Sequence, residues 1–430
     1  PVQHPPKPQG KAGEEVHKEL VTQYEWHDLE DIGLLKMDFL GLRTLTLIKN
    51  TMKIVKAKYT KAGKKLPKLF QDYFDTMVFE PALDDKNTFE RVLQKGDTSG
   101  VFQFEWDGIR NFLVKLKPTD VNDIIAMGAL YRPGPMEFIP RYIDRKNGKE
   151  EKEYMLPDLL EILVSKYSEE VAEEEKIKMV EDLDPILGLT YGIAVYQEQL
   201  MFLVQAMAWF SLAEADNLRR GIGKKIKEVI EQIKWQFIEK AATFRWYKEE
   251  TARWVYEKMI EPAAFYSFNK SHSVTYGMLS YQTAYLKANY PIEFNAALLR
   301  SVEEDSEKLS KFINELQLQG YKVLPPHVNE SFTHVAAIED TIRLGFLCIK
   351  GVGSDVAECI QAEREKNGPY KSLEDFLTRC QNVVNKKTLE SLAKAGAFNG
   401  FMDRKTILYN VPRIIEWAKM LNFTKLLGSY

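Results

Sequence analysis

Residues 33–43 read GLLKMDFLGLR, and the interpretation of the whole chain starts from this stretch. Its apolar positions alternate, so as a strand it would turn Leu35, Met37 and Phe39 toward a core and place Asp38 on the opposite face. A helix is expected directly after it. Asp38 would then be held rigidly at an open rim, which is where a metal-binding acid belongs. The alternative is that Asp38 is a turn residue that only bonds backbone N–H groups before the helix.

The composition is that of a globular protein with more than one domain. The 430 residues are 45% hydrophobic and 28% charged, which is enough to build two or three separate cores. The formal net charge is −3, so any nucleic-acid surface must be local. No apolar run is long enough to cross a bilayer or to act as a signal peptide. The three cysteines fit neither a zinc site nor a disulfide framework, which favours the cytoplasm (Cys348, Cys359 and Cys380).

The chain opens with a segment that resembles a loop. The first residue is Pro1, four of the first eight residues are proline, and residues 1–20 are predicted to be loop. We therefore expect the chain to be part of a longer protein. From residue 42 to about 59, apolar residues recur at helical spacing, so an amphipathic helix should follow the Asp38 stretch (Leu45, Ile48, Met52 and Val55).

A rigid arginine is predicted at ALYRPGPM (129–136). Pro133 pushes Arg132 out of the helical region, and the Pro-Gly-Pro run stiffens the backbone that follows. A guanidinium offered from a fixed backbone is suited to phosphate. The alternative is an ordinary loop arginine paired with a nearby acid.

Two strongly charged stretches lie further along the chain. Residues 168–184 hold eight acids against two lysines and should form a solvated helical insertion. Residues 217–245 hold eight cations against three acids. Within them, Gly221 and Gly223 would let the backbone turn between two basic pairs and cradle a phosphate (Arg219 and Arg220, Lys224 and Lys225). A solvated helix end is the alternative explanation.

The sequence FNKSHS (268–273) predicts the start of a long helix that stops before Pro291. Its Ser271 or Ser273 could cap the helix, and Lys270 and His272 lie in the first turn. Free N–H groups and the positive end of the dipole favour a bound anion there, and a triphosphate fits that description. A capped helix with one surface histidine is the alternative.

Near the C-terminus, residues 348–357 contain the Gly-apolar-Gly turn of a helix-hairpin-helix, IKGVG (349–353). Residues 383–398 resemble a second, degenerate copy with a helix closed by Gly396. Lys350, Gly351 and Gly353 would bring a cation and main-chain N–H groups close to a phosphate without reading a base, which predicts sequence-independent DNA binding. A plain connector between helices is the alternative.

Taken in order, these segments resemble one family, the bacterial C-family replicative DNA polymerases, that is, the alpha subunits of DNA polymerase III. The resemblance spans nearly the whole chain, and motifs of this length and order are far more specific than a short fingerprint. The segments that carry it are GLLKMDFLGLRTLT (33–46), SGVFQFE (99–105), ALYRPGPM (129–136), YGIAVYQEQ (191–199), ADNLRRGIGKK (215–225), FNKSHS (268–273), YPIEF (290–294), LPP (324–326) and IKGVG (349–353).

The resemblance implies a mainly α (α+β) fold. It implies the C-terminal piece of a nucleotidyltransferase-type palm, a large helical fingers domain and a tandem helix-hairpin-helix region. The expected domains are a loop (1–20), the end of the palm (21–43), the fingers (44–320) and a little-finger and tandem helix-hairpin-helix region that binds DNA (321–430).

The resemblance also implies an activity: addition of a dNMP from a dNTP to a primer 3′-hydroxyl, with two Mg²⁺ ions stabilising the entering and leaving oxygens. Asp38 matches one of the three metal-binding aspartates of the family. The candidates to hold the triphosphate or the template backbone are six cations (Arg132, Arg219, Arg220, Lys224, Lys270 and His272). The expected partners are primer-template DNA, dNTPs, a sliding clamp, a clamp loader and a proofreading exonuclease.

The sequence also departs from the family pattern. The family's other two metal aspartates form an Asp-x-Asp pair, and residues 1–32 offer no such pair. One carboxylate does not hold two magnesium ions, so we expect this chain alone not to polymerise. A protein of another class that this sequence also allows is a non-catalytic DNA-binding or scaffolding protein derived from the same family.

Overall fold

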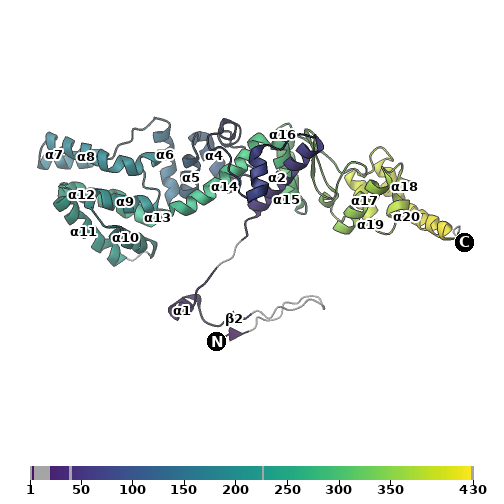
Figure 1. Ribbon diagram of the computed structural model, residues 1–430, viewed down its shortest axis with the longest axis horizontal. Coiled ribbons are helices and arrows are strands. Elements are labelled where there is room, and N and C mark those ends of the chain that lie inside the picture. Colours follow the sequence, from purple (N-terminus) through teal and green to yellow (C-terminus); the bar gives the residue numbers. More distant parts are fainter. Residues whose placement is uncertain (1, 4–19, 38–40, 225–226, 428–430) are drawn as a thin grey trace. The chain divides into compact units, whose positions relative to one another are not determined.

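The computed structural model describes residues 2–3, 20–37, 41–224 and 227–427, and the chain divides into two units, 1–43 and 44–430 (Figure 1). The first unit holds β1 (Val2–Gln3), which pairs antiparallel with β2 (Val21–Thr22), and α1 (Trp26–Asp31). The short strand β1 falls inside the stretch that was predicted to be loop. The predicted catalytic residue Asp38 lies outside the described residues.

The strand predicted at the start of 33–43 is wrong for the part that the structure describes. Residues 34–37 are in neither strand nor helix, and Leu35 and Met37 are 77% and 65% exposed. A strand needs a neighbour to satisfy its backbone N–H and C=O groups. None of the described residues of this unit pairs with 34–37, so alternating apolar residues alone do not form a strand here.

The second unit is mainly helical, which confirms the predicted fold class. Its first part contains α2 (Arg43–Lys61), α3 (Lys68–Thr76), the π-helical turn η1 (Thr88–Leu93), α4 (Asp107–Leu116), α5 (Val121–Leu130), η2 (Pro135–Phe138) and α6 (Ile139–Lys146). Its middle part contains α7 (Pro157–Lys166), α8 (Glu169–Leu187), η3 (Gly188–Thr190), α9 (Gln197–Ala208), α10 (Leu212–Lys224), α11 (Lys227–Phe244), α12 (Glu249–Val255), η4 (Tyr256–Ile260) and α13 (Glu261–Tyr266).

The last part of this unit begins with the long helix α14 (Lys270–Asn289), followed by α15 (Pro291–Ser301) and α16 (Ser306–Leu318). A small sheet in the order β3-β5-β4 comes next, formed by β3 (Lys322–Leu324), β4 (Ala336–Ile338) and β5 (Thr341–Arg343). The final elements are η5 (Phe346–Cys348), α17 (Ser354–Asn367), α18 (Leu373–Cys380), α19 (Lys386–Ala395) and α20 (Arg404–Leu427).

Helix α14 is shared by two hydrophobic cores. Its buried Tyr281 and Ala284 pack with η1, α4 and α5, whereas Leu286 packs with α2, α3 and α15. Figure 1 shows α14 running beside α5. The two helices approach closely because residue 277 is glycine: a Cβ at Gly277 would lie 2.6 Å from Cγ1 of Ile125. α14 is therefore fixed on more than one side.

The charged stretches are more regular than predicted. The acidic one forms α8, whose inner face is apolar, so it is half core rather than a wholly solvated insertion. The turn predicted at Gly221 and Gly223 is wrong, because α10 continues through both glycines. Ala215, Leu218 and Gly221 recur at helical spacing and are all buried, so the packing of this face keeps the backbone helical.

Two separate segments meet directly before α14. Tyr196 and Phe268 form a parallel β-bridge, in which the Phe268 N–H donates to Val195 O (3.0 Å) and the Gln197 N–H donates to Phe268 O (2.9 Å). The buried side chain of Gln199 supports this loop: its Oε1 accepts from the N–H groups of Val195 and Tyr196, both at 2.9 Å. Its amide nitrogen donates to Ile186 O (3.1 Å) and Thr190 Oγ1 (2.8 Å). Gln199 therefore fixes one side of the bridge.

The C-terminal elements contain two turns of the predicted kind. Gly351 has φ +93° in the turn before α17, and α18 and α19 form the second pair of helices, with Gly396 (φ +80°) ending α19 in the left-handed conformation. The first pair is less regular than predicted, because η5 is only a short 3-10 turn. The first turn lies against α19: a Cβ on Gly351 would lie 3.0 Å from Ser391 Oγ of this helix.

We predict that Gln199→Met loosens the bridge. Methionine has a similar volume but leaves the Val195 and Tyr196 N–H groups buried without an acceptor, at a cost of about 2–4 kcal/mol in the local opening free energy. Hydrogen exchange of peptides covering 190–199 and 266–273 measures this loss. Gln197→Met is the matched control, because the described structure shows no hydrogen bond from the Gln197 side chain. Equal protection in both variants would contradict this role of Gln199.

We also predict that Gly351→Ala destabilises the C-terminal turns. An L-residue at φ +93° costs about 1–2 kcal/mol, and the new methyl group crowds Ser391. Gly353 is the matched control because its φ is −88° and a Cβ would meet nothing within 4 Å. Gly353 is the N-cap of α17, where alanine is less favourable than glycine, so Gly353→Ala should cost less than Gly351→Ala but up to about 1 kcal/mol. Amide exchange in α17 and α19 measures both, and equal losses would argue against a conformational role for Gly351.

Candidate functional site

The start of α14 is the centre of the candidate site, and a carboxylate of the protein already occupies part of it. The Asn269 side chain caps the helix by accepting from the His272 N–H at 2.8 Å. Glu198 accepts from the Lys270 N–H (2.9 Å) and from the Asn269 amide (3.1 Å). The sequence predicted free N–H groups here for an anion. In the structure the N–H groups of Lys270 and His272 are already bonded within the protein, and the side chains of these two residues are further groups that can meet an anion.

Arg132 reaches this site from the preceding loop. Its Nε donates to Ala129 O at 2.9 Å, and its Nη2 donates to Tyr266 O. The guanidinium carbon lies 4.4 Å from the ring centroid of Phe268. Burial lowers the pKa of Arg132, but an arginine remains charged in proteins.

The described hydrogen-bond partners of Arg132 are backbone carbonyl oxygens. In the part of the chain that the structure describes, no carboxylate pairs with Arg132, so its positive charge is not neutralised by an acid. Two backbone carbonyls fix the guanidinium while the charge stays available. This arrangement fits the predicted phosphate-binding role better than that of an ordinary ion pair.

Aromatic rings surround the histidine of the same motif. The ring of His272 lies between Phe268 (5.3 Å between centroids) and Tyr276 (4.2 Å), and Tyr276 stacks on Phe102 at 5.3 Å. The Lys270 ammonium lies 5.7 Å from the centroid of the Tyr196 ring. Arg132, Lys270 and His272 therefore gather around the bridge between Tyr196 and Phe268.

A cavity of about 210 Å³ opens beside these residues. α14 contributes one wall, and α5 and the loop before α4 contribute the rest. Gln103 holds a left-handed backbone (φ +60°) at its edge, a conformation that is uncommon for a residue with a side chain. The lining residues are Gln103, Phe104, Ile124, Gly128, Phe268, His272, Ser273, Tyr276, Gly277 and Ser280. The cavity combines flat aromatic faces with hydroxyl and imidazole groups, so it can receive a flat polar group.

Arg219 and Arg220 form a second basic group on α10. Both share the carboxylate of Asp216, at 2.8 Å from Arg219 and 2.7 Å from Arg220, and the bond from Arg219 lowers the pKa of Asp216. α10 packs against α9 and α13, the helices that flank the bridge. No described contact joins these arginines to Arg132, Lys270 or His272. The Lys224 side chain lies outside the described residues.

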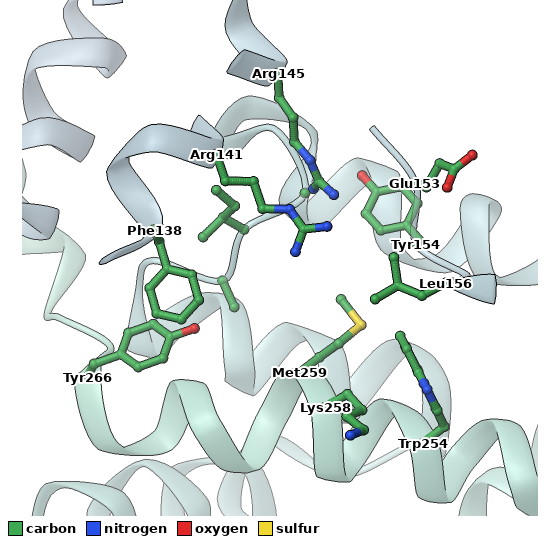
Figure 2. A pocket seen from close by; sticks show the side chains of 13 residues that line it. Phe138, Arg141, Arg145, Glu153, Tyr154, Leu156, Trp254, Lys258, Met259 and Tyr266 are labelled. Atoms are coloured by element: carbon green, nitrogen blue, oxygen red, sulfur yellow. The ribbon is translucent and has the colours of Figure 1, made fainter. Parts of the chain in front are cut away.

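A second cavity is lined by residues of α6 and of the segment from α12 to α13, and it contains arginines that the sequence analysis did not single out. Arg141 and Arg145 of α6 share the carboxylate of Glu150, at 2.7 and 3.0 Å, and Figure 2 shows both pointing into the cavity toward Met259. Arg145 also donates to Tyr191 O at 2.9 Å, which ties α6 to YGIAVYQEQ. The available signal was the spacing of four between Arg141 and Arg145, which places both on one face of a helix.

Glu198 is another residue that sequence reasoning missed. It was quoted within YGIAVYQEQ, but its role depends on α9 meeting the start of α14. No spacing within that motif predicts this meeting. Its partners therefore emerge only from the fold.

The C-terminal candidates lie at the paired turns. Lys350 and Gly351 are exposed, and Gly353 begins α17. A Cβ on Gly351 would lie 3.8 Å from Cε of Lys387, so the first turn of α19 brings a second lysine close to the first hairpin. Lys387 was not among the predicted residues.

The structure gives no geometry for the predicted metal site, because Asp38 is not among the described residues. Within the described ranges, no three or more His, Cys, Asp or Glu side chains cluster as metal ligands would. None of the helices described is both long and apolar enough to span a membrane.

The amino-acid sequence matches known proteins along most of its length. Residues 44–244 match the family model of the bacterial DNA polymerase III alpha subunit finger domain, and residues 320–407 match that of a helix-hairpin-helix motif. The second match confirms the predicted C-terminal module.

Curated relatives extend this similarity. DNA polymerase III subunit alpha of Thermus aquaticus is 44% identical over 400 residues, which cover 93% of this chain and 30% of the relative. The proteins of the same name from Aquifex aeolicus and Chlamydia pneumoniae are 42% and 41% identical, over 96% and 92% of this chain and 32% and 29% of their own lengths. The chain thus spans about a third of the length of these relatives. It belongs to the family of bacterial DNA polymerase III alpha subunits, of which it carries the finger domain and a helix-hairpin-helix motif.

Proposed function

We propose that this chain holds the triphosphate of an incoming dNTP during DNA-templated DNA synthesis. The observation that carries the proposal is that Arg132, Lys270 and His272 each contact a ring of the bridge between Tyr196 and Phe268. Lys270 and His272 lie more than a hundred positions after Arg132 in the sequence. Arg132 retains its charge, because its described partners are carbonyl oxygens. Three such groups around one bridge, of which His272 lines the cavity, suit an anion with several phosphates.

The aromatic rings and Glu198 define how such a ligand would lie. Glu198 accepts a hydrogen bond from the Lys270 N–H, and its negative charge would repel a phosphate from the start of α14. Phosphates should therefore contact side chains rather than the backbone of the first turn. Phe268 and Tyr276 offer ring faces beside the cavity, where a base or sugar can pack. Arg219 and Arg220 on α10 remain candidates for the template backbone or the far end of the triphosphate.

We propose that the paired C-terminal turns hold duplex DNA by its backbone. Lys350 is exposed at the first turn, and Gly351 and Gly353 allow a phosphate to approach main-chain N–H groups. Such contacts position a duplex without reading its bases. Lys387 of the neighbouring turn adds a cation to the same surface.

We propose Asp38 as one ligand of a magnesium ion, on the grounds of sequence similarity alone. The described residues do not supply a set of acids that fits the two ions expected of the family. If Asp38 acts in this way, carboxylates from other parts of the complete protein must complete the site. The residues of this chain would bind and orient the nucleotide.

For the complete protein we propose the partners expected from the family: primer-template DNA, dNTPs, a sliding clamp, a clamp loader and a proofreading exonuclease, in the cytoplasm. We assign no residue of this chain to the protein partners.

In the complete polymerase that contains this chain, we predict that Arg132→Ala and Lys270→Ala each raise the KM for dNTP. A charge-assisted contact with phosphate contributes about 1.5–3 kcal/mol, which corresponds to roughly a 10- to 100-fold change. Steady-state primer extension at varied dNTP concentration measures the effect. Lys311→Ala is the control, because Lys311 is exposed on α16 and lies outside the cluster. An unchanged KM in both cluster variants would remove these residues from nucleotide binding.

A second prediction separates catalysis from binding. Asp38→Asn in the complete polymerase should abolish primer extension and leave duplex affinity within about twofold, because it removes a proposed metal ligand but no phosphate contact. The 430-residue chain alone should bind duplex DNA without extending a primer. Normal turnover of Asp38→Asn would exclude Asp38 from the metal site. Primer extension by the 430-residue chain alone would show that one carboxylate of this region suffices for DNA synthesis.

A further inference from the structure

A groove of about 460 Å³ lies on the outer surface of the middle helices, and the proposed function makes no use of it. One wall is the exposed face of α8, with Glu174, Ile177 and Glu181 at helical spacing. The other wall is built from the residues that follow α9 and α11. The lining residues are Glu174, Ile177, Lys178, Glu181, Trp209, Phe244, Arg245 and Trp246.

Large aromatic side chains are exposed in this groove. Trp209 is 62% exposed and Trp246 is 79% exposed, and the ring of Trp209 is nearly parallel to that of Phe244 (11° between planes, 6.4 Å between centroids). Single exposed apolar residues are ordinary on protein surfaces, but adjoining ones in a hollow mark an interaction site. Tryptophan is also the commonest kind of anchor residue at protein interfaces.

The backbone at both tryptophans is one that favours glycine. Trp209 ends α9 with φ +51°, and Trp246 follows α11 with φ +54°. The Trp209 N–H donates to Gln205 O at 3.0 Å, which is the hydrogen bond of a left-handed helix end. A bulky residue in this conformation is strained. Two neighbouring helices thus place an exposed tryptophan where glycine would be more favourable, and this observation is independent of the shape of the groove.

The charge of the groove selects the class of partner. Its two cations are engaged by the protein itself, because Lys178 donates to Arg245 O and lies over the Tyr247 ring while Arg245 pairs with Asp182. Glu174 and Glu181 have no ion pair or hydrogen bond in the described part of the chain. Exposed carboxylates beside indole rings repel phosphate and attract ammonium or guanidinium groups.

We propose that this groove binds a basic amphipathic peptide segment of another protein. An apolar side chain of the peptide would pack between Ile177 and the two tryptophans. Its lysines or arginines would pair with Glu174 and Glu181 and lie over the indole faces. This is recognition of a helix in a groove, with charge selecting the partner.

The probe is a synthetic peptide of about 18 residues with leucine on one helical face and lysine on the other. Its titration into the 430-residue chain, followed by calorimetry, should show saturable one-site binding that weakens as salt is added. A peptide with every lysine replaced by glutamate should not bind. Absence of saturable binding, or equal affinity for the two peptides, would overturn the proposal.

Two variants locate the site without damaging the fold. Trp209→Gly and Trp246→Gly remove the rings but suit the left-handed backbone, so thermal unfolding should show no loss of Tm while peptide affinity falls about tenfold or more. The control is Trp106→Ala, because Trp106 is 73% exposed and lies outside the groove. Equal losses of affinity in the control and the groove variants would overturn the proposal.

The role of the groove carboxylates is tested by a substitution in the groove and by the same change of charge at a site outside it. Glu181→Lys should weaken binding about tenfold, whereas Glu304→Lys, at an exposed site outside the groove, should not. Two other outcomes would reassign the groove and overturn the proposal. One is binding of a single-stranded oligonucleotide that Trp209→Gly abolishes. The other is a wild-type dimer in sedimentation that the same variant dissociates.

Discussion

The structure depends on one short contact, the parallel bridge between Tyr196 and Phe268. It consists of two backbone hydrogen bonds, yet it joins segments more than seventy positions apart just before α14 begins. A bridge of only two hydrogen bonds is sufficient here because Gln199 supplies the acceptor for the adjacent buried N–H groups of Val195 and Tyr196. A buried amide group without a partner costs free energy comparable to a lost hydrogen bond. The bridge, rather than any single charged residue, determines where Lys270 and His272 face Arg132.

α14 extends this constraint to a third motif. The SGVFQFE segment is hydrogen-bonded to α14 at Phe102, whose N–H donates to Thr283 Oγ1 (3.1 Å) and whose carbonyl accepts from Ser280 (2.9 Å). The buried Lys287 pairs with Asp97 at 2.5 Å and donates to Ser99 O at 3.1 Å, although burial lowers its pKa. Breaking such a pair would leave a buried charge without a partner, so it fixes position more than it adds stability. These polar contacts explain how α14 packs firmly without being uniformly apolar.

The sequence predicted features that depend on neighbouring residues better than contacts between distant segments. The long helix after FNKSHS and the C-terminal Gly-apolar-Gly turn follow from caps and glycines, which act within a few residues, whereas the mainly helical fold was implied by the family resemblance. Among the described residues, no strand pairs with residues 34–37 before Asp38, and an alternating pattern cannot supply such a partner. The turn at Gly221 and Gly223 was wrong because glycine permits a turn without requiring one, and packing of Ala215 and Leu218 favoured the helix. The role of Glu198 depends on a bridge that no local spacing encodes.

The hydrogen-bond partners of the charged groups decide which of them stay available to an anion at the start of α14. A helix N-terminus attracts any anion, and in a folded chain a carboxylate of the protein is the nearest one. Glu198 therefore accepts a hydrogen bond from the Lys270 N–H. The positive end of the α14 dipole thus already faces a carboxylate of the protein and does not require a bound anion. Arg132 is different, because carbonyl oxygens satisfy its geometry without cancelling its charge. A cation held by carbonyl oxygens retains an attraction for phosphate that a salt-bridged cation has largely lost. The partners of a charged group are therefore more informative about binding than its presence in a motif.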